Sequence, residues 1–130
     1  MSGRTGRLRI FFDGGCRPNP GTMEIAAVAR GVTDAQRDIG RGDSQEAEWL
    51  ALLHAVRIAI EIGAEDVELV GDSTAVIRQA RGAAKCRDPE MRRHLAAYQA
   101  AVATIPRVRL RHVPRSKNLA GIALAKAHPR

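Results

Sequence analysis

Three acidic residues lie at points of the sequence from which a folded chain could bring their side chains together. Asp13 follows one short apolar run, Asp72 follows another, and Glu48 lies near the start of a long helical pattern. Carboxylate oxygens are the ligands that Mg²⁺ and Mn²⁺ prefer, and three carboxylates close together repel one another without a cation. Two such ions about 3.5–4 Å apart can promote in-line displacement at phosphorus. Metal-dependent phosphodiester hydrolysis is therefore one interpretation of these residues.

Each of the three acids also has an ordinary structural explanation. An Asp before two glycines is typical of a turn, and an Asp before Ser73 is typical of a helix cap. A Glu in the first turn of a helix complements the helix dipole. The spacing leaves both interpretations open, so the elements that position the residues have to decide between them.

Apolar runs and alternation predict the strands. The turn residues that follow Asp13, up to Gly21, predict that the chain reverses there. From Arg107 to His112, apolar residues alternate with arginines, which predicts a strand with one apolar and one cationic face. The predicted strands are residues 8–12, 25–29, 36–39, 67–70 and 107–112.

Caps and apolar periodicity predict four helices. Asp43 and Glu46 form a capping pattern that starts a long helix, and Gly63 ends it near residue 62. The wide apolar arc of this helix predicts that a sheet covers it. Pro89 suits the first position of a third helix that ends before Pro106. The remaining helices are expected at residues 74–80, capped by Asp72 or Ser73, and at residues 119–126.

The order of these elements is β-β-β-α-β-α-α-β-α. Hairpins followed by strands separated by helices predict one α/β domain over residues 1–130. Its sheet should be antiparallel at one edge and parallel beyond, with helices on its faces. Because sites in such folds gather at strand ends and topological switch points, we expect Asp13 and Asp72 to lie near Glu48.

The composition favours a polyanionic partner. The net charge is +7, and no acid interrupts the basic residues Arg107, Arg109, Arg111, Arg115 and Lys117. Nucleic acid is the leading candidate, and a merely basic surface is the alternative. The two cysteines, Cys16 and Cys86, lack zinc spacing and are expected to be free thiols in a reducing cytosol. With no membrane-length apolar run or signal peptide, we expect a cytoplasmic monomer that binds no membrane.

Four segments, in order along the chain, resemble the motifs of the type 1 ribonuclease H family. They read FFDGGCRPNPG at 11–21, SQEAEWLAL at 44–52, VGDSTAVI at 70–77 and VPRSKNLAGIALA at 113–125. Each motif is weak alone, but the ordered set spans nearly the whole chain. The resemblance implies the ribonuclease H-like α/β fold, a five-stranded mixed sheet with helices on both faces.

The same resemblance implies a function and a set of site residues. It implies cleavage of the RNA strand of RNA–DNA hybrids with Mg²⁺, for which Mn²⁺ is a substitute. Asp13, Glu48 and Asp72 would be the catalytic metal ligands, with Asn118 as a further candidate ligand. Ser44 and Gln45 would hydrogen-bond sugar hydroxyls. The full set of candidate substrate-binding residues is Gly14, Gly15, Cys16, Arg17, Asn19, Ser44, Gln45, Ser73, Lys85, Arg115 and Asn118.

Ile122 departs from the family pattern. The family usually has a fourth carboxylate four residues after the asparagine matched by Asn118, and isoleucine can neither bind a metal nor accept a hydrogen bond. We expect reduced activity or a need for high metal concentration, with Asn118 or His128 as weaker substitute ligands. The alternative is a non-catalytic domain of ribonuclease H fold that binds hybrids or other nucleic acid. A related nuclease acting on another substrate is a third hypothesis.

Overall fold

The computed structural model describes residues 6–126. The strands of this part are β1 (Leu8–Arg17), β2 (Gly21–Ala29), β3 (Val32–Gln36), β4 (Arg41–Gly42), β5 (Asp66–Gly71) and β6 (Arg107–His112). The helices are α1 (Ser44–Ile62), α2 (Thr74–Ala80), α3 (Pro89–Val102) and α4 (Leu119–Lys126), with a 3₁₀ turn η1 (Arg115–Lys117) before α4. Within residues 6–126, no helix is long and apolar enough to cross a membrane.

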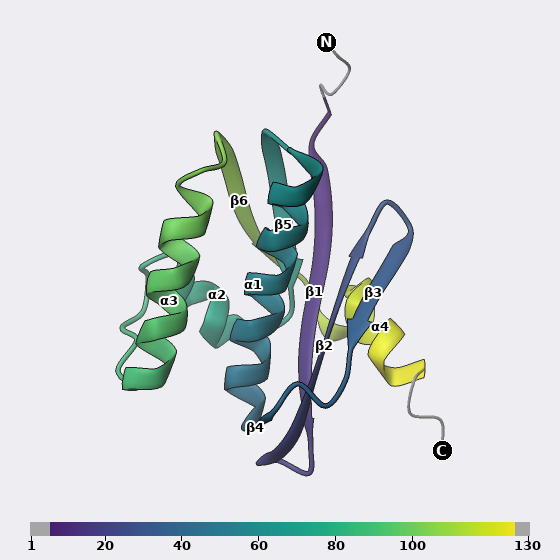
Figure 1. The fold of residues 1–130 in the computed structure, drawn as a ribbon, viewed down its shortest axis with the longest axis vertical. Helices are drawn as coiled ribbons and strands as arrows, with labels where there is room; N and C mark the ends of the chain where they lie inside the picture. The colour runs from purple at the N-terminus through teal and green to yellow at the C-terminus, as the bar shows by residue number, and fades with distance from the viewer. Residues whose placement is uncertain (1–5, 127–130) are drawn as a thin grey trace.

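The strands form one mixed sheet in the order β3-β2-β1-β5-β6, as Figure 1 shows. The β1, β2 and β3 strands pair antiparallel, whereas β1–β5 and β5–β6 are parallel. This confirms the predicted arrangement of an antiparallel edge and a parallel remainder. The short strand β4 pairs with β2 as a sixth strand, one more than the five predicted.

Helices cover both faces of the sheet, as predicted (Figure 1). Along β1, Leu8, Ile10 and Phe12 point into the main core, which they share with α1, α2 and α3. Phe11 points the other way and packs with Ala120 and Leu124 of α4. The period of two along a strand therefore separates a large core under three helices from a smaller one under α4.

Three strand predictions were wrong in their bounds. The second strand begins at Gly21 instead of residue 25. The chain does not reverse at Asp13: β1 continues to Arg17 and the turn is confined to residues 18–20. The third strand lies at Val32–Gln36 instead of 36–39. All five of its residues are exposed, so no apolar pattern marked it. It forms because Arg30 and Gly31, with φ of 54° and 77°, make a two-residue turn that pairs it with β2.

The α1 helix begins and ends where the sequence predicted. The Asp43 carboxylate accepts a hydrogen bond from the Glu46 backbone N–H, and Gly63 adopts a left-handed φ of 79° after the last turn. The Glu46 side chain contacts His94 of α3 instead of returning to the cap, with Nε2 and Oε2 3.0 Å apart. The helix is thereby tied to α3 while its first turns approach β1.

Candidate functional site

The structure brings the three predicted acids together. One carboxylate oxygen each of Asp13, Glu48 and Asp72 lies within 4.8 Å of the others. Asp13 lies within β1, and Asp72 directly follows the neighbouring parallel strand β5. The β1–β5 register pairs Phe11 with Val70, so the two aspartates follow at the same level of adjacent strands. The convergence therefore depends on parallel pairing between segments far apart in the sequence.

The structural alternatives for the two aspartates do not hold. Ser73 caps α2, because its hydroxyl accepts the Val76 N–H, and this leaves the Asp72 carboxylate to the cluster. Asp13 lies within β1, opposite Ala26 of β2, and forms no turn. Since neither aspartate is used by the local backbone in these ways, both side chains are available for a site.

Gly14 allows Glu48 to reach the cluster. A Cβ atom built on Gly14 would lie 2.1 Å from the Ala47 carbonyl oxygen, so only glycine permits this approach of α1 to β1. The Gly14 N–H in turn donates to the Glu48 carboxylate at 3.1 Å. Gly14 therefore serves close packing of a helix on a strand, and neither glycine after Asp13 forms a turn.

The cluster holds more negative charge than its surroundings neutralise. Burial, and then repulsion from Asp72, raises the pKa of Asp13 to about 7, although Arg115 opposes the shift. Burial, and then repulsion from Asp13 and Asp72, raises the pKa of Glu48 to about 9. Without a cation, the site therefore retains protons near neutral pH. An all-carboxylate donor set with this unmet charge fits divalent ions such as Mg²⁺ or Mn²⁺.

Asn118 orients a carboxylate and is poorly placed to be a ligand. Its fully buried side chain donates from the amide nitrogen to the Phe12 carbonyl and to Asp72 Oδ2, both at 2.9 Å. The amide oxygen already accepts the Ala120 N–H at 3.1 Å. Because these contacts use both ends of the amide, Asn118 links β1, Asp72 and the start of α4.

Gly121, rather than Ile122, is the α4 residue that faces the carboxylates. A Cβ atom at Gly121 would lie 3.4 Å from Asp13 Oδ2 and 3.7 Å from Asp72 Oδ2. The Ile122 side chain is 38% exposed and does not line the cavity above the carboxylates. Neither position supplies a fourth acid. His128, the other substitute ligand considered, lies outside the described residues.

A cavity of about 580 Å³ opens above the carboxylates. It brings together most of the candidate substrate-binding residues, namely Gly14, Gly15, Cys16, Arg17, Ser44, Gln45, Ser73 and Arg115. Asn19 and Asn118 do not line the cavity, but each holds a residue that does. Asn19 forms two hydrogen bonds with Ser44, of 3.0 and 3.1 Å, and Asn118 donates to Asp72. Lys85 lies exposed in the loop between α2 and α3 and does not line the cavity.

Glu24 also lines the cavity, and the sequence interpretation missed it. It is buried in β2 opposite Gly15 and raises the pKa of Asp13 through its charge. The sequence feature that could have identified Glu24 is its position as an acid inside the apolar run from Met23 to Val28. Such an acid in a central strand is costly unless polar neighbours surround it, so its position marks the polar cavity.

Comparisons with known proteins agree with this architecture. Residues 11–128 match the family described as "Reverse transcriptase-like". Ribonuclease HI of Halobacterium salinarum is 35% identical over 94% of this chain, and the match covers 64% of that protein. The bifunctional protein Rv2228c of Mycobacterium tuberculosis is 29% identical over 86% of the chain, and that match covers 32% of its length. The chain thus spans less than two thirds of these curated relatives.

Solved structures show the same fold. The crystal structure of RNase H1 from Halobacterium salinarum superposes with a TM-score of 0.86 at 33% identity, covering 92% of this chain and 94% of that one. LC11-RNase H1 in complex with an RNA/DNA hybrid gives a TM-score of 0.80 at 27% identity, covering 94% and 99%. Fold and carboxylate cluster together define a ribonuclease H-like protein. The chain belongs to the type 1 ribonuclease H family, as its four motifs predicted.

Proposed function

We propose that this chain is a metal-dependent endoribonuclease that cleaves the RNA strand of RNA–DNA hybrids. The observation that carries the proposal is the meeting of Asp13, Glu48 and Asp72 within 4.8 Å at the base of an open polar cavity. Two kinds of relative support the substrate: a curated Ribonuclease HI, and LC11-RNase H1, whose structure is a complex with an RNA/DNA hybrid.

The three carboxylates would hold the metal ions, for which we propose Mg²⁺ with Mn²⁺ as a substitute. Bound ions would supply an activated water and stabilisation of the leaving oxygen. The protein contributes rigidity, because the Gly14 N–H holds Glu48 and the Asn118 amide holds Asp72. Fixed carboxylates keep the ligand geometry ready before substrate arrives.

The cavity walls would bind the substrate. Arg115 lies close enough to Asp13 to lower its pKa, so its charge faces the place where a scissile phosphate would lie. Ser44 and Gln45 also line the cavity and would offer hydrogen bonds to ribose hydroxyls, which distinguish RNA from DNA. Asn19 keeps Ser44 in place from the β1–β2 turn.

We propose that activity is weaker than a site with four acids would give. Neither Gly121 nor Ile122 offers an oxygen to the ion that would activate water. Fewer charged ligands bind a divalent ion less tightly. The expected behaviour is a cleavage rate that still rises at metal concentrations where a four-acid site is saturated.

The direct test is cleavage of a labelled RNA–DNA hybrid in Mg²⁺ and in Mn²⁺ by the parent chain and by Asp13→Asn. We expect the variant to lose at least about 10³-fold in rate, equivalent to about 4 kcal/mol of transition-state stabilisation. Asp38→Asn is the matched control, because Asp38 is exposed and asparagine tolerates its φ of 52°. Equal activity of Asp13→Asn and Asp38→Asn would refute the proposed site.

A second candidate function is a binding domain without turnover. The lack of an acid on the side of α4 that faces the carboxylates favours it. It predicts tight, salt-sensitive hybrid binding with no cleavage by the parent chain in either metal. The cleavage assay therefore separates the two candidates.

We also propose that the protein acts as a cytoplasmic monomer. Within residues 6–126, both cysteines are free, and Cys16 lines the cavity, where its thiol donates to the Gly42 carbonyl at 3.0 Å. A reducing compartment would preserve that thiol. Light scattering of the purified chain tests the monomer.

A further inference from the structure

The half of the sheet that α4 leaves open carries a dense arginine surface. The α4 helix packs on β1 and β2, while α1, α2 and α3 pack on the opposite face. Val108 and Leu110 of β6 point toward those three helices, so the alternate residues of β6 point to the open side. We call this surface the arginine face; it consists of Arg7, Arg9, Arg107, Arg109 and Arg111.

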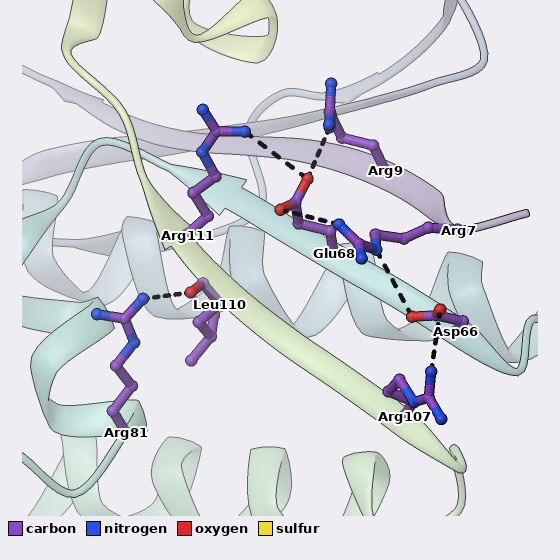
Figure 2. Close-up of polar contacts among 8 residues, drawn as sticks. All are labelled: Arg7, Arg9, Asp66, Glu68, Arg81, Arg107, Leu110 and Arg111. Carbon is purple, nitrogen blue, oxygen red and sulfur yellow. Dashed lines mark hydrogen bonds and ion pairs between the residues drawn. The ribbon is translucent and has the colours of Figure 1, made fainter.

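Two carboxylates of β5 organise the arginine face, as Figure 2 shows. Glu68, whose side chain is 8% exposed, accepts a hydrogen bond from Arg9 at 2.7 Å, and Arg7 and Arg111 lie at 3.8 and 4.0 Å. Asp66 lies 3.9 Å from Arg7 and 3.8 Å from Arg107. These contacts hold the guanidinium groups in place but leave much of them in solvent.

The arginine face keeps an excess of positive charge. Five arginines against Asp66 and Glu68 leave three charges unmatched, and the four arginine side chains in ion pairs are 37–65% exposed. The residues outside the described part, 1–5 and 127–130, contain no Asp or Glu.

The surface also lacks the features of a protein interface. The large apolar side chains that are exposed within residues 6–126 are Val32, Ile60, Ile62, Leu119 and Ile122, and none of them belongs to β1, β5 or β6. Protein interfaces usually depend on buried apolar or aromatic anchors. Guanidinium groups held in rows suit phosphate oxygens, which they can bind in a bidentate manner.

The arginine face and the carboxylate cluster lie on the same side of the sheet. Along β1, Arg9, Phe11 and Asp13 are alternate residues and share one side. Asp13 lies four positions after Arg9, a distance of about 13 Å along the strand. A duplex engaged at the cavity would therefore be close enough for a flanking segment to meet the arginines.

We propose that the arginine face binds the sugar–phosphate backbone of a nucleic-acid duplex, independently of sequence and outside the catalytic cavity. This proposal shares with the proposed function the assumption that the protein binds nucleic acid. It does not depend on cleavage, because none of the five arginines lines the catalytic cavity. Such contacts raise affinity and its salt dependence without reading bases.

The test compares two double variants on an Asp13→Asn background, so binding is measured without turnover. Arg107→Gln with Arg109→Gln removes two charges from the arginine face but leaves Arg7, Arg9 and Arg111 around Glu68. Arg57→Gln with Arg93→Gln removes two exposed charges from α1 and α3 on the opposite side. Fluorescence anisotropy of a 30-base-pair hybrid and a 30-base-pair DNA duplex, each over a salt series, gives affinity and salt slope.

We expect the Arg107–Arg109 double variant to bind both duplexes about tenfold more weakly at low salt. Its log–log salt slope should fall in magnitude by about 1.8, or 0.9 for each lost phosphate contact. The Arg57–Arg93 control should keep the parent slope, and unchanged thermal unfolding confirms that both variants fold.

Two results would overturn the proposal. One is a salt slope for the Arg107–Arg109 variant equal to that of the control, which shows that duplexes do not use this surface. The other is tighter binding of labelled polyglutamate than of either duplex at equal charge concentration, lost in the same variant, which assigns the surface to an acidic polypeptide. Cleavage by the parent chain is assayed separately, so failure of the proposed function is distinguishable from either result.

Discussion

Glu48 and Glu68 are two glutamates that the fold removes from water, and their environments act in opposite directions. Glu48 lies among other carboxylates, and burial together with Asp13 and Asp72 raises its pKa to about 9. Burial also acts to raise the pKa of Glu68, but the hydrogen bond from Arg9 and the charges of Arg9, Arg111 and Arg7 lower it overall. Loss of water alone therefore does not mark a functional carboxylate; the charges around it decide.

The comparison separates a site built to receive cations from one that is already neutralised. The carboxylate cluster has an uncompensated negative charge, which a folded protein tolerates only with protons or metal ions. The arginine face carries its carboxylates as internal counterions and presents the surplus positive charge outward. The first three predictions below compare the two regions directly, and the last two test the carboxylate cluster alone.

The largest effect should come from a comparison of two aspartates at opposite ends of β5: Asp72, which follows the strand, and Asp66, which begins it. Asp72→Asn should reduce hybrid cleavage at least about 10³-fold, because it removes a charged ligand from the cluster. Asp66→Asn, in the arginine face, should leave the rate of cleavage within about twofold of the parent. Rates measured at several Mg²⁺ concentrations check both. If Asp66→Asn were as damaging as Asp72→Asn, the division between the two regions would be wrong.

A stability comparison should show opposite signs for two conservative changes. In EDTA at pH 8, Asp13→Asn should raise the free energy of unfolding by roughly 1–2 kcal/mol, because it removes a charge whose pKa is raised to about 7. Glu68→Gln should lower it by a similar amount, since it leaves three arginines without their shared carboxylate. Urea denaturation measures both, and changes of the same sign would contradict the electrostatic assignment.

The two regions should make the stability of the protein depend on pH in opposite directions, which urea denaturation over a pH series measures. The folded-state pKa values of Asp13 and Glu48 are about 7 and 9, above the ordinary values of 3.8 and 4.5, so cation-free stability falls as pH rises from about 4 to 9. The pKa of Glu68 is lowered, so its contribution exists above its ordinary value of 4.5 and disappears as pH falls below it.

Metal should counteract only the loss at high pH. We expect Mg²⁺ to raise the unfolding temperature by about 5 °C at pH 8 and hardly at all at pH 5, where protons already neutralise the cluster. Thermal melts measure the shift, and Mg²⁺-free samples treated with EDTA serve as controls. An equal Mg²⁺ effect at both pH values would place the binding site elsewhere.

The smallest expected effect tests where a fourth acid belongs. Gly121→Asp should increase the cleavage rate about fivefold at low metal, because its Cβ would lie 3.4 Å from Asp13 Oδ2. Ile122→Asp should gain less, since Ile122 is 38% exposed and does not line the cavity. Gly121→Asn controls for size without charge. A larger gain from Ile122→Asp would mean that the sequence match, and not the geometry, locates the missing ligand.

Local patterns in the sequence were sufficient for the main elements. Asp43 and Gly63 marked both ends of α1, because caps act on backbone groups only a few residues away. Apolar patterns marked the buried strands, because side chains alternate between the two faces of a sheet and this alternation is visible within a few residues. Apolar patterns did not predict β3, because every residue of this strand is exposed. The strand forms by pairing with β2 through the Arg30–Gly31 turn.

By itself, the sequence determined the family, the order of the elements and the identity of the three acids, since these depend on residue types and their neighbours along the chain. Only the tertiary structure decided that Asn118 orients Asp72, that Glu24 borders the cavity and that Gly121 faces the carboxylates. It likewise decided that arginines from two strands surround Glu68. These relations depend on strand register and on how closely a helix approaches the sheet, which are set by contacts between distant segments.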